Sequence, residues 1–284
     1  MSFSTDVKEE LSRLSNLADK DSVKAELYGY LNSVNVSEVK NKLKFTTESE
    51  YNINRFSKLL NNVNIINYDI DINGKNFNIF ISNKERANLK NIYENYFVPE
   101  KESIEKSFVR GVFLGSGSIN NPKNKYHIEI ILNNIDISEI IIKILEKYGI
   151  LLKLLNNKTK ISIYSKDGEE ISKFLAFIGA NKAVIKFEEI RVYRDMRNNV
   201  NRIVNCETAN LNKTVNAAVK QIEAIKRLKE TGEFNNLPDN LKELAKLRIE
   251  NPEATLTELG KMLKEPIGKS GVNYRLNTII KKSL

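Results

Sequence analysis

In the first two-thirds of the chain, the pattern of hydrophobic and polar residues predicts the same order of helices and strands twice. In the first succession, helical and alternating segments surround Asn73-Gly74, which predicts a tight hairpin because its central positions favour positive φ. The predicted elements are a helix at Val23–Ser33, a strand at Lys42–Thr47, a helix at Asn52–Asn62, the hairpin and a helix at Lys84–Tyr96.

The second succession has the same order of elements. Gly29 and Gly111 are 82 residues apart and Asn73 and Asn156 are 83 apart, and a near-constant offset is what a duplication predicts. We therefore expect an α+β domain over residues 1–190, with two αββαββα copies at about 20–97 and 105–190. The elements of the second copy are Phe108–Leu114, Tyr126–Leu132, Ile137–Tyr148, a hairpin at Asn156-Asn157 and Glu169–Ile178, capped by Gly179.

Beyond the repeat the hydrophobic period becomes helical throughout. From Ala209 the apolar residues recur at helical spacing and predict a long helix that ends near Thr231-Gly232. Residues 236–284 then predict three short helices: Leu241–Glu250, a second opened by the Thr255–Glu258 capping box, and Gly271–Lys281 with Ser270 as its cap. Three short helices with a break before the last indicate an all-α helix-turn-helix domain.

In such a domain the third helix enters the major groove of DNA and its outward residues meet base edges. Asparagine suits adenine, and lysine and arginine suit phosphates. A small protein-docking domain is the alternative interpretation. The residues expected to contact DNA are Thr255, Lys261, Lys269, Ser270, Asn273, Tyr274, Arg275, Asn277 and Lys281.

Positive charge is concentrated toward the end of the chain. The net charge is +9, and Lys186–Leu284 holds 19 Lys and Arg against 13 Asp and Glu. Within residues 191–235, a basic, Asn-rich connector has the groups that phosphate or interdomain contacts require, although the same asparagines could simply satisfy turns. Its candidate residues are Arg191, Arg194, Arg197, Arg202, Asn205, Asn210, Asn212 and Lys213.

The cysteine and histidine content limits the disulfides and metal sites that the chain can form. The chain has one cysteine and one histidine, which excludes an intrachain disulfide framework and a Cys/His zinc cluster. The N-terminal segment lacks an apolar signal core, and the most apolar stretch, Ile135–Leu155, is interrupted by charges, so it is not transmembrane. We expect a cytoplasmic protein with no membrane segment, metal or cofactor.

The segment SFVRGVFLGSGSI, from Ser107 to Ile119, resembles the signature helix of the LAGLIDADG homing-endonuclease fold. With Gly111 on that motif's internal glycine, Ser116 stands where the resemblance implies a metal-binding aspartate, and Val34 stands there in the first copy. A hydroxyl and an isopropyl group are poor substitutes for the anionic oxygens that Mg²⁺ prefers. We therefore expect a nuclease architecture without catalytic residues, whose two signature helices form a buried, glycine-lined seam.

The connector RDMRNNVNRIVNCETANLNKT and the segments TLTELGKML and KSGVNYRL extend the resemblance to the WhiA family of bacterial DNA-binding regulators. The resemblance implies a sequence-specific transcription factor or nucleoid-associated protein in cell division, chromosome segregation or sporulation. Its partners would be double-stranded DNA and other regulators, such as a sigma factor or division proteins. The alternatives are a protein-interaction scaffold with nonspecific DNA affinity, and an active endonuclease.

Overall fold

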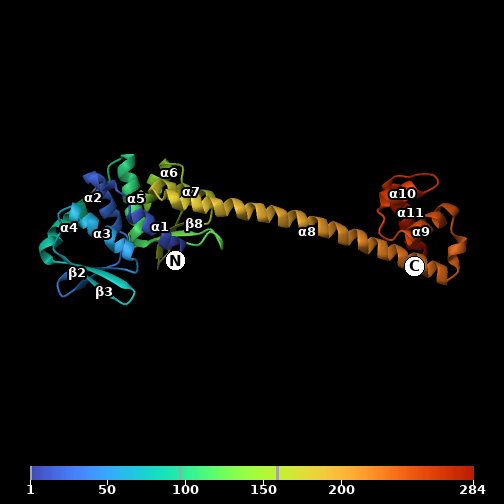
Figure 1. The fold of residues 1–284 in the computed structure, drawn as a ribbon, viewed down its shortest axis with the longest axis horizontal. Helices are drawn as coiled ribbons and strands as arrows, with labels where there is room; N and C mark the ends of the chain where they lie inside the picture. Colours follow the sequence, from blue (N-terminus) through green and yellow to red (C-terminus); the bar gives the residue numbers. More distant parts are fainter. Residues whose placement is uncertain (1, 96–97, 158–159) are drawn as a thin grey trace. The chain divides into compact units, whose positions relative to one another are not determined.

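The chain forms two compact units, Met1–Asp195 and Met196–Leu284, in this computed structural model (Figure 1). The structure describes residues 2–95, 98–157 and 160–284. The first unit contains two four-stranded sheets covered by helices, and the second is entirely helical. The predicted α+β class, with a duplicated first domain, a long helix and a helical tail, is confirmed.

Two antiparallel sheets with the same strand order make up the first unit. One has the order β1-β2-β4-β3 and the other β5-β6-β8-β7, so the second copy repeats the topology of the first. The first copy, preceded by α1 (Phe3–Ser12) and the short helix η1 (Asn16–Ala18), comprises α2 (Lys20–Leu31), β1 (Val36–Val39), β2 (Lys42–Thr47), α3 (Glu50–Asn62), β3 (Tyr68–Asn73), β4 (Asn76–Ile81) and α4 (Asn83–Asn95). The second comprises α5 (Glu102–Ser116), β5 (Gly117–Ile119), β6 (Ile128–Leu132), α6 (Ile135–Lys147), β7 (Lys153–Asn157), β8 (Lys160–Ser165) and α7 (Gly168–Ile178).

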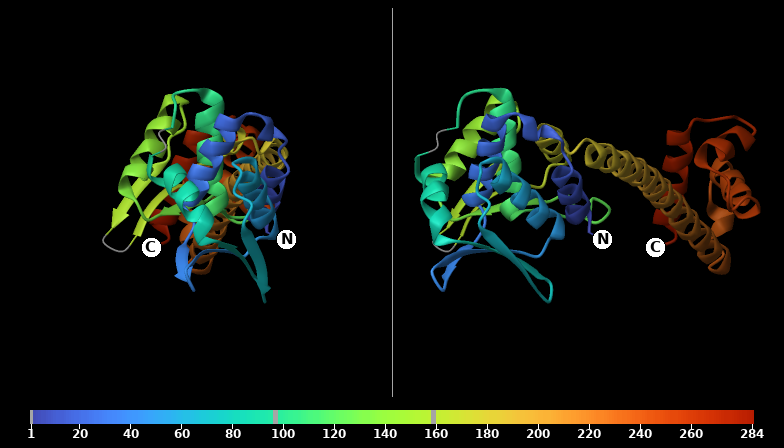
Figure 2. Two further views of the ribbon diagram at one scale, coloured as in Figure 1. Left: turned by 90° about the vertical axis from the view of Figure 1, so that its left-hand side faces the viewer. Right: turned by 60° about the vertical axis from the view of Figure 1, so that its left-hand side comes forward.

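Each sheet has one apolar face against the helices. Phe45 lies opposite Ile79 in the first sheet, and Ile130 lies opposite Ile163 in the second, and all four side chains are buried. Since side chains alternate between the two faces of a strand, the intervening polar residues lie on the other face. Figure 2 shows the helices of the first copy on one side of its sheet.

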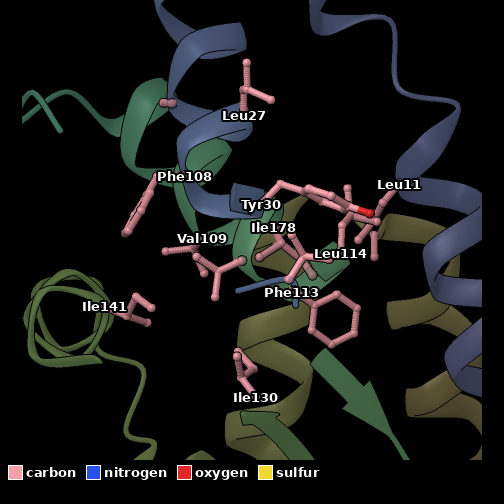
Figure 3. Packing of buried hydrophobic residues seen from close by; sticks show 14 of the residues in the cluster. Leu11, Leu27, Tyr30, Phe108, Val109, Phe113, Leu114, Ile130, Ile141 and Ile178 are labelled. Carbon is pink, nitrogen blue, oxygen red and sulfur yellow. The ribbon is translucent and has the colours of Figure 1, made fainter. Parts of the chain in front are cut away.

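Helices α2 and α5 form the seam between the two copies. A Cβ atom added to Gly29 would lie 2.2 Å from the carbonyl oxygen of Phe108, and one added to Gly111 would lie 1.9 Å from that of Glu26. Each glycine thus admits the backbone of the opposite helix, and the predicted glycine-lined seam is confirmed. Figure 3 shows side chains of both helices near this crossing, including Tyr30 and Leu114.

A buried cluster of charges also ties the two copies together. Glu26 of α2 accepts hydrogen bonds from Arg55 of α3 at 2.6 Å and from Arg110 of α5 at 3.0 Å. Arg55 also donates to the carbonyl oxygen of Leu14, and Arg110 to that of Ile178. Buried charges need this full set of partners, because removing one partner leaves an uncompensated ion.

Neither predicted hairpin turns at the predicted asparagine-containing pair of residues. Asn73 pairs with Asn76, so the first turn is Gly74-Lys75, with φ of 62° at Gly74. Asn156 and Asn157 belong to β7 and pair with β8, and residues 158–159, between the two strands, lie outside the described residues. All five residues of β7 are exposed, so no alternation marked Asn156 and Asn157 as strand residues, and the turn propensity of asparagine favoured a turn there. The predicted helix end at Tyr96 also lies outside the described residues.

The second unit has a core of its own. It contains most of α8 (Asn181–Glu230), then η2 (Glu233–Asn236), α9 (Asp239–Glu250), α10 (Leu256–Met262) and α11 (Lys269–Lys282). Ile225 and Leu228 of α8 pack with Leu244, Leu259 and Leu276 of the three following helices. The end of α8 is therefore part of the helical tail's core.

The predicted start of the long helix at Ala209 was wrong, because α8 begins at Asn181 and includes the whole connector. Residues 181–230 contain neither glycine nor proline, so nothing in this segment interrupts the helix. Each asparagine disfavours a helix by only a few tenths to about 0.7 kcal/mol relative to alanine. The asparagines therefore lie along a helix, and the interpretation that they satisfy turns is wrong.

Candidate nucleic-acid interface

Helix α11 has one buried and one solvent-exposed face. Val272, Leu276 and Ile279 are buried against the other helices of the unit, as predicted. The helix begins at Lys269 with Gly268 as its N-cap, so the prediction that Ser270 caps it was wrong. Ser270 lies in the first turn instead, where the hydrogen-bonding capacity of its hydroxyl remains available at the surface. The exposed face carries Ser270, Asn273, Tyr274, Asn277 and Lys281.

The charges on α11 are all positive. The helix contains Lys269, Arg275, Lys281 and Lys282 and no acidic residue. Arg275 is half-buried and lines a second hollow together with Leu241 of α9, on a different side of the helix from Asn273. Of the candidate residues on α11, Arg275 alone is thus set apart from the exposed face.

A capping box stabilises the N-terminus of helix α10. The Thr255 Oγ1 accepts from the Glu258 backbone N–H at 3.3 Å, and the Glu258 carboxylate accepts from the Thr255 N–H at 2.7 Å, as predicted. These hydrogen bonds hold the pKa of Glu258 below its usual value. Lys261, in the last turn of α10, is exposed.

Sequence reasoning missed a groove in the second unit, of about 410 Å³, beside the start of α11. Its walls include Lys213 and Gln221 of α8, Thr255 at the start of α10, and Asn273 of α11. Arg248 of α9 also lines it. The apolar period of α8 could have indicated Gln221, because this residue occupies a buried position where the pattern calls for an apolar side chain.

The connector residues differ in their surroundings along α8. Arg191 pairs with Glu188 at 3.0 Å, while Arg194 donates to the carbonyl oxygen of Pro122 at 2.6 Å and stacks over the Tyr126 ring. These two arginines therefore make contacts within the first unit. The other candidates are exposed along α8: Arg197, Arg202, Asn205, Asn210, Asn212 and Lys213.

The positions of the expected metal ligands lie at the ends of the seam helices. Ser116 is the last residue of α5, and its buried Oγ has no hydrogen-bond partner, while Val34 follows α2 and is 7% exposed. Within the described ranges, no group of three or more His, Cys, Asp or Glu residues could hold a metal ion. The two positions bring no carboxylate to the seam.

On the outward faces of the two sheets, two lysines pair with acids. Lys42 binds Asp69 at 2.6 Å, and Lys160 binds Glu129 at 2.7 Å. The hydrogen bond and charge of Lys160 lower the pKa of Glu129. These two pairs reduce the uncompensated positive charge on the outward faces of the sheets. Separately, in the part of the chain that the structure describes, no helix is long and apolar enough to cross a bilayer.

Comparisons with known proteins match both units. The model of the WhiA LAGLIDADG-like domain matches residues 105–197, and that of the WhiA C-terminal HTH domain matches residues 200–282. The probable cell division protein WhiA of Clostridium tetani is 38% identical over 99% of this chain and 96% of its own. Its counterpart in Staphylococcus haemolyticus is 39% identical over 98% of this chain and 95% of its own. The crystal structure of full-length WhiA from Thermotoga maritima superposes with a TM-score of 0.62 at 27% identity, covering 100% of this chain and 98% of that one.

Proposed function

The chain belongs to the WhiA family, and from this premise we propose that it is a sequence-specific DNA-binding regulator whose helix α11 reads base edges in the major groove. The observation that carries the proposal is the exposed face of α11. That face combines amides at Asn273 and Asn277 with cations at both ends of the helix and has no acidic residue. Amides suit adenine and cations suit phosphates, so this face can supply both base contacts and backbone contacts.

The first unit would serve as a platform without nuclease activity. Valine and serine stand where metal-binding carboxylates would be needed, so these two positions offer no ligands for two-metal phosphodiester cleavage. The pairing of Lys42 and Lys160 with acids also disfavours the sheets as the main DNA surface. We place the principal DNA contacts in the second unit, with the exposed cations of α8 in a supporting role.

The relatives' names suggest the process. The Clostridium and Staphylococcus proteins carry the name of a cell division protein, so we propose a role in cell division or chromosome segregation for this chain. Such a role places the protein on the nucleoid, with double-stranded DNA as its partner and with sigma factors or division proteins as candidate protein partners.

The base-reading role of α11 is tested by selecting duplexes from a random library with the full-length chain. We expect Asn273→Ala to relax the preference at one position, with a loss of about 1–3 kcal/mol of discrimination there. Asn235→Ala is the control, since Asn235 is an exposed asparagine in the same unit away from α11. If Asn273→Ala and Asn277→Ala both select the wild-type sequence with undiminished preference, α11 does not read bases.

The loss of nuclease activity is tested with supercoiled plasmid, Mg²⁺ or Mn²⁺, and the purified full-length chain. We expect the plasmid to stay intact while it is bound and retarded in a gel. Metal-dependent cleavage that disappears when a single acidic residue near Ser116 is replaced would show that this unit still acts as a nuclease.

A further inference from the structure

The groove beside α11 is lined by positive and polar side chains from four helices. Lys213 and Lys269 stand at its rim, both exposed, and Thr255 and Asn273 add a hydroxyl and an amide. No acidic residue lines it. A groove with this lining attracts an anion and offers it several hydrogen-bond donors.

Gln221 is buried in this groove, and its side-chain oxygen lacks a hydrogen-bond partner in the described part of the chain. Its side chain is 4% exposed, and its Oε1 has no partner among the described residues. The adjacent turn of α8 places Ile225 in the core, so the helix cannot rotate to bring Gln221 into solvent. Buried amides are normally hydrogen-bonded, and an orphaned one indicates a missing ligand or water.

Arg248 is a second buried polar residue of the groove, and in this case the unpartnered atom is a donor. It is 2% exposed, and its Nη1 donates to the carbonyl oxygen of Ala254 at 2.8 Å and to that of Pro252 at 3.3 Å. Its Nε has no partner, and burial lowers its pKa without any carboxylate to offset the loss of water. The carbonyls fix the guanidinium in place, and its positive charge has no counter-ion in the described part of the chain.

We propose that this groove is a phosphate-binding site built from α8, α9, α10 and α11. Phosphate oxygens would accept from Arg248, Lys213, Lys269 and Thr255, and they match the bidentate donor geometry of a guanidinium. The Gln221 amide can turn to present its Nε2 as a further donor. The inference rests on the proposed DNA-binding function for its preferred occupant, a backbone phosphate of bound DNA. A free phosphate ester has the same chemistry.

A phosphate in this groove would link α8 to base reading. Asn273 lines the groove and also lies on the exposed face of α11, so the bound phosphate would belong to a nucleotide beside the base that α11 contacts. Backbone contacts of this kind fix the register of a recognition helix. The Lys213–Gln221 segment of α8 would therefore position α11 on DNA as well as support the domain.

The DNA arm of the test uses the full-length chain and the duplex that the wild type selects from a random library. Single phosphates of that duplex are replaced in turn by neutral methylphosphonates, and affinity is measured by fluorescence anisotropy. For each bound domain, we expect one phosphodiester linkage at which the neutral methylphosphonate weakens wild-type binding about tenfold. In Lys213→Gln/Gln221→Met, the same neutralisation should have little further effect, because the contact is already lost.

Two controls separate this contact from folding and from general charge. Lys226→Gln removes an exposed charge of α8 outside the groove and should keep the wild-type response to each methylphosphonate. Thermal unfolding checks that the double variant is folded. If Gln221→Met prevents folding, the single variant Lys213→Gln is used in its place. If the folded variants respond to every linkage as the wild type does, the DNA phosphate does not occupy the groove.

The free-phosphate arm compares thermal unfolding in potassium phosphate and in potassium chloride of equal ionic strength, without DNA. A rise in the wild-type melting temperature in phosphate that is absent in Lys213→Gln/Gln221→Met supports the site. If the same protein shows no DNA linkage whose neutralisation weakens binding, this result assigns the site to a free phosphate ester. If no duplex is selected at all, the proposed function fails and this arm alone decides the groove. Wild-type behaviour of the folded variants in every arm performed overturns the proposal.

Discussion

At the scale of single residues, the seam depends on two glycines that face backbone. Replacing Gly111 by alanine would place a methyl group 1.9 Å from the Glu26 carbonyl oxygen, closer than any real contact. Because the obstacle is backbone, α2 and α5 must separate. We expect Gly111→Ala to lower the free energy of unfolding of the first unit by about 3 kcal/mol or more, measured by urea denaturation.

The control for this substitution is Gly268→Ala, which lies in the second unit and is measured on the unfolding of that unit. A Cβ atom at Gly268 would meet nothing within 4 Å, and its φ of −70° suits any residue. The cost should stay below about 1 kcal/mol, as for an unfavourable N-cap. Equal effects of the two substitutions would contradict the steric origin of the seam's glycine.

Lys8 gives the first unit a pH dependence. Burial lowers the pKa of Lys8 from 10.5 to about 8, beside the ring of Phe113. Below pH 8 the folded protein bears the full cost of burying the cation. Between pH 8 and 10.5 the unfolded chain binds more protons, so stability rises with pH and the cost is relieved. Lys8→Met should therefore stabilise the protein at pH 7, by about 1–2 kcal/mol, and by less at pH 10.

Urea unfolding of wild type and variant at the two pH values measures this difference. Lys24→Met, at an exposed position of α2, is the control and should change stability equally at both. A stabilisation by Lys8→Met that is the same at pH 7 and pH 10 would show that the ammonium group is not the cause.

Individual residues differ in how well the sequence predicts their roles. Gly29, Gly111, Gly179 and the Thr255–Glu258 pair were predictable, because a motif or a cap fixes each of them locally. Gln221 and Arg248 were not, since a buried polar position depends on helices distant in sequence. The separation of Arg275 from Asn273 likewise follows from how α11 packs on α9.

At the scale of elements, the middle of α8 is a helix with little to stabilise it. Every residue from Met196 to Ala217 is exposed, and asparagine is frequent in this stretch. Helices that bury no face depend on intrinsic propensity, which is weak here. We expect amide hydrogen exchange to be faster between Met196 and Leu211 than at Ile225–Leu228, which pack in the core.

Mass spectrometry of exchange in the full-length chain measures this contrast. Asn205→Ala with Asn210→Ala should slow exchange in the middle segment alone, because alanine favours the helix. Uniform protection along α8 would mean that a partner, such as another copy of the chain, covers the middle segment.

Short strands were the elements that the sequence concealed. β1 is exposed at all four residues, and β5 has only three, so neither presents the alternation that identified β2 and β6. The turn at Lys40-Asn41, where φ is 46° and 61°, joins β1 to β2, but it identifies a hairpin only once the strand pairing is known. Long amphipathic helices such as α3 and α6 were predicted because burial repeats along them.

At the scale of the whole molecule, two apolar cores hold the chain. One lies in the first unit, and the other joins the end of α8 to α9, α10 and α11. We expect calorimetry to show two thermal transitions. Leu276→Ala should lower the melting temperature of the second unit's transition alone, since removing a fully buried leucine costs about 2–5 kcal/mol of stability.

The reciprocal variant is Ile141→Ala, which removes a buried side chain from the first core and should lower only the other transition. A single transition that both variants shift together would show that the units unfold as one. The duplication and the helical tail were predictable at this scale from repeated periods, whereas the continuity of α8 was not, because asparagine-rich sequence is equally typical of loops.

Ile225 and Leu228 of α8 belong to the core of the helical tail, and this has a practical consequence for protein engineering. A chimera that transplants only residues 236–284 onto another protein would leave an apolar surface uncovered where these side chains belong. A graft that starts at about Lys213 would carry both the missing core residues and the groove wall. The smallest portable form of the helical tail therefore begins inside α8, and the host protein must end in a helix that can be fused to it in phase.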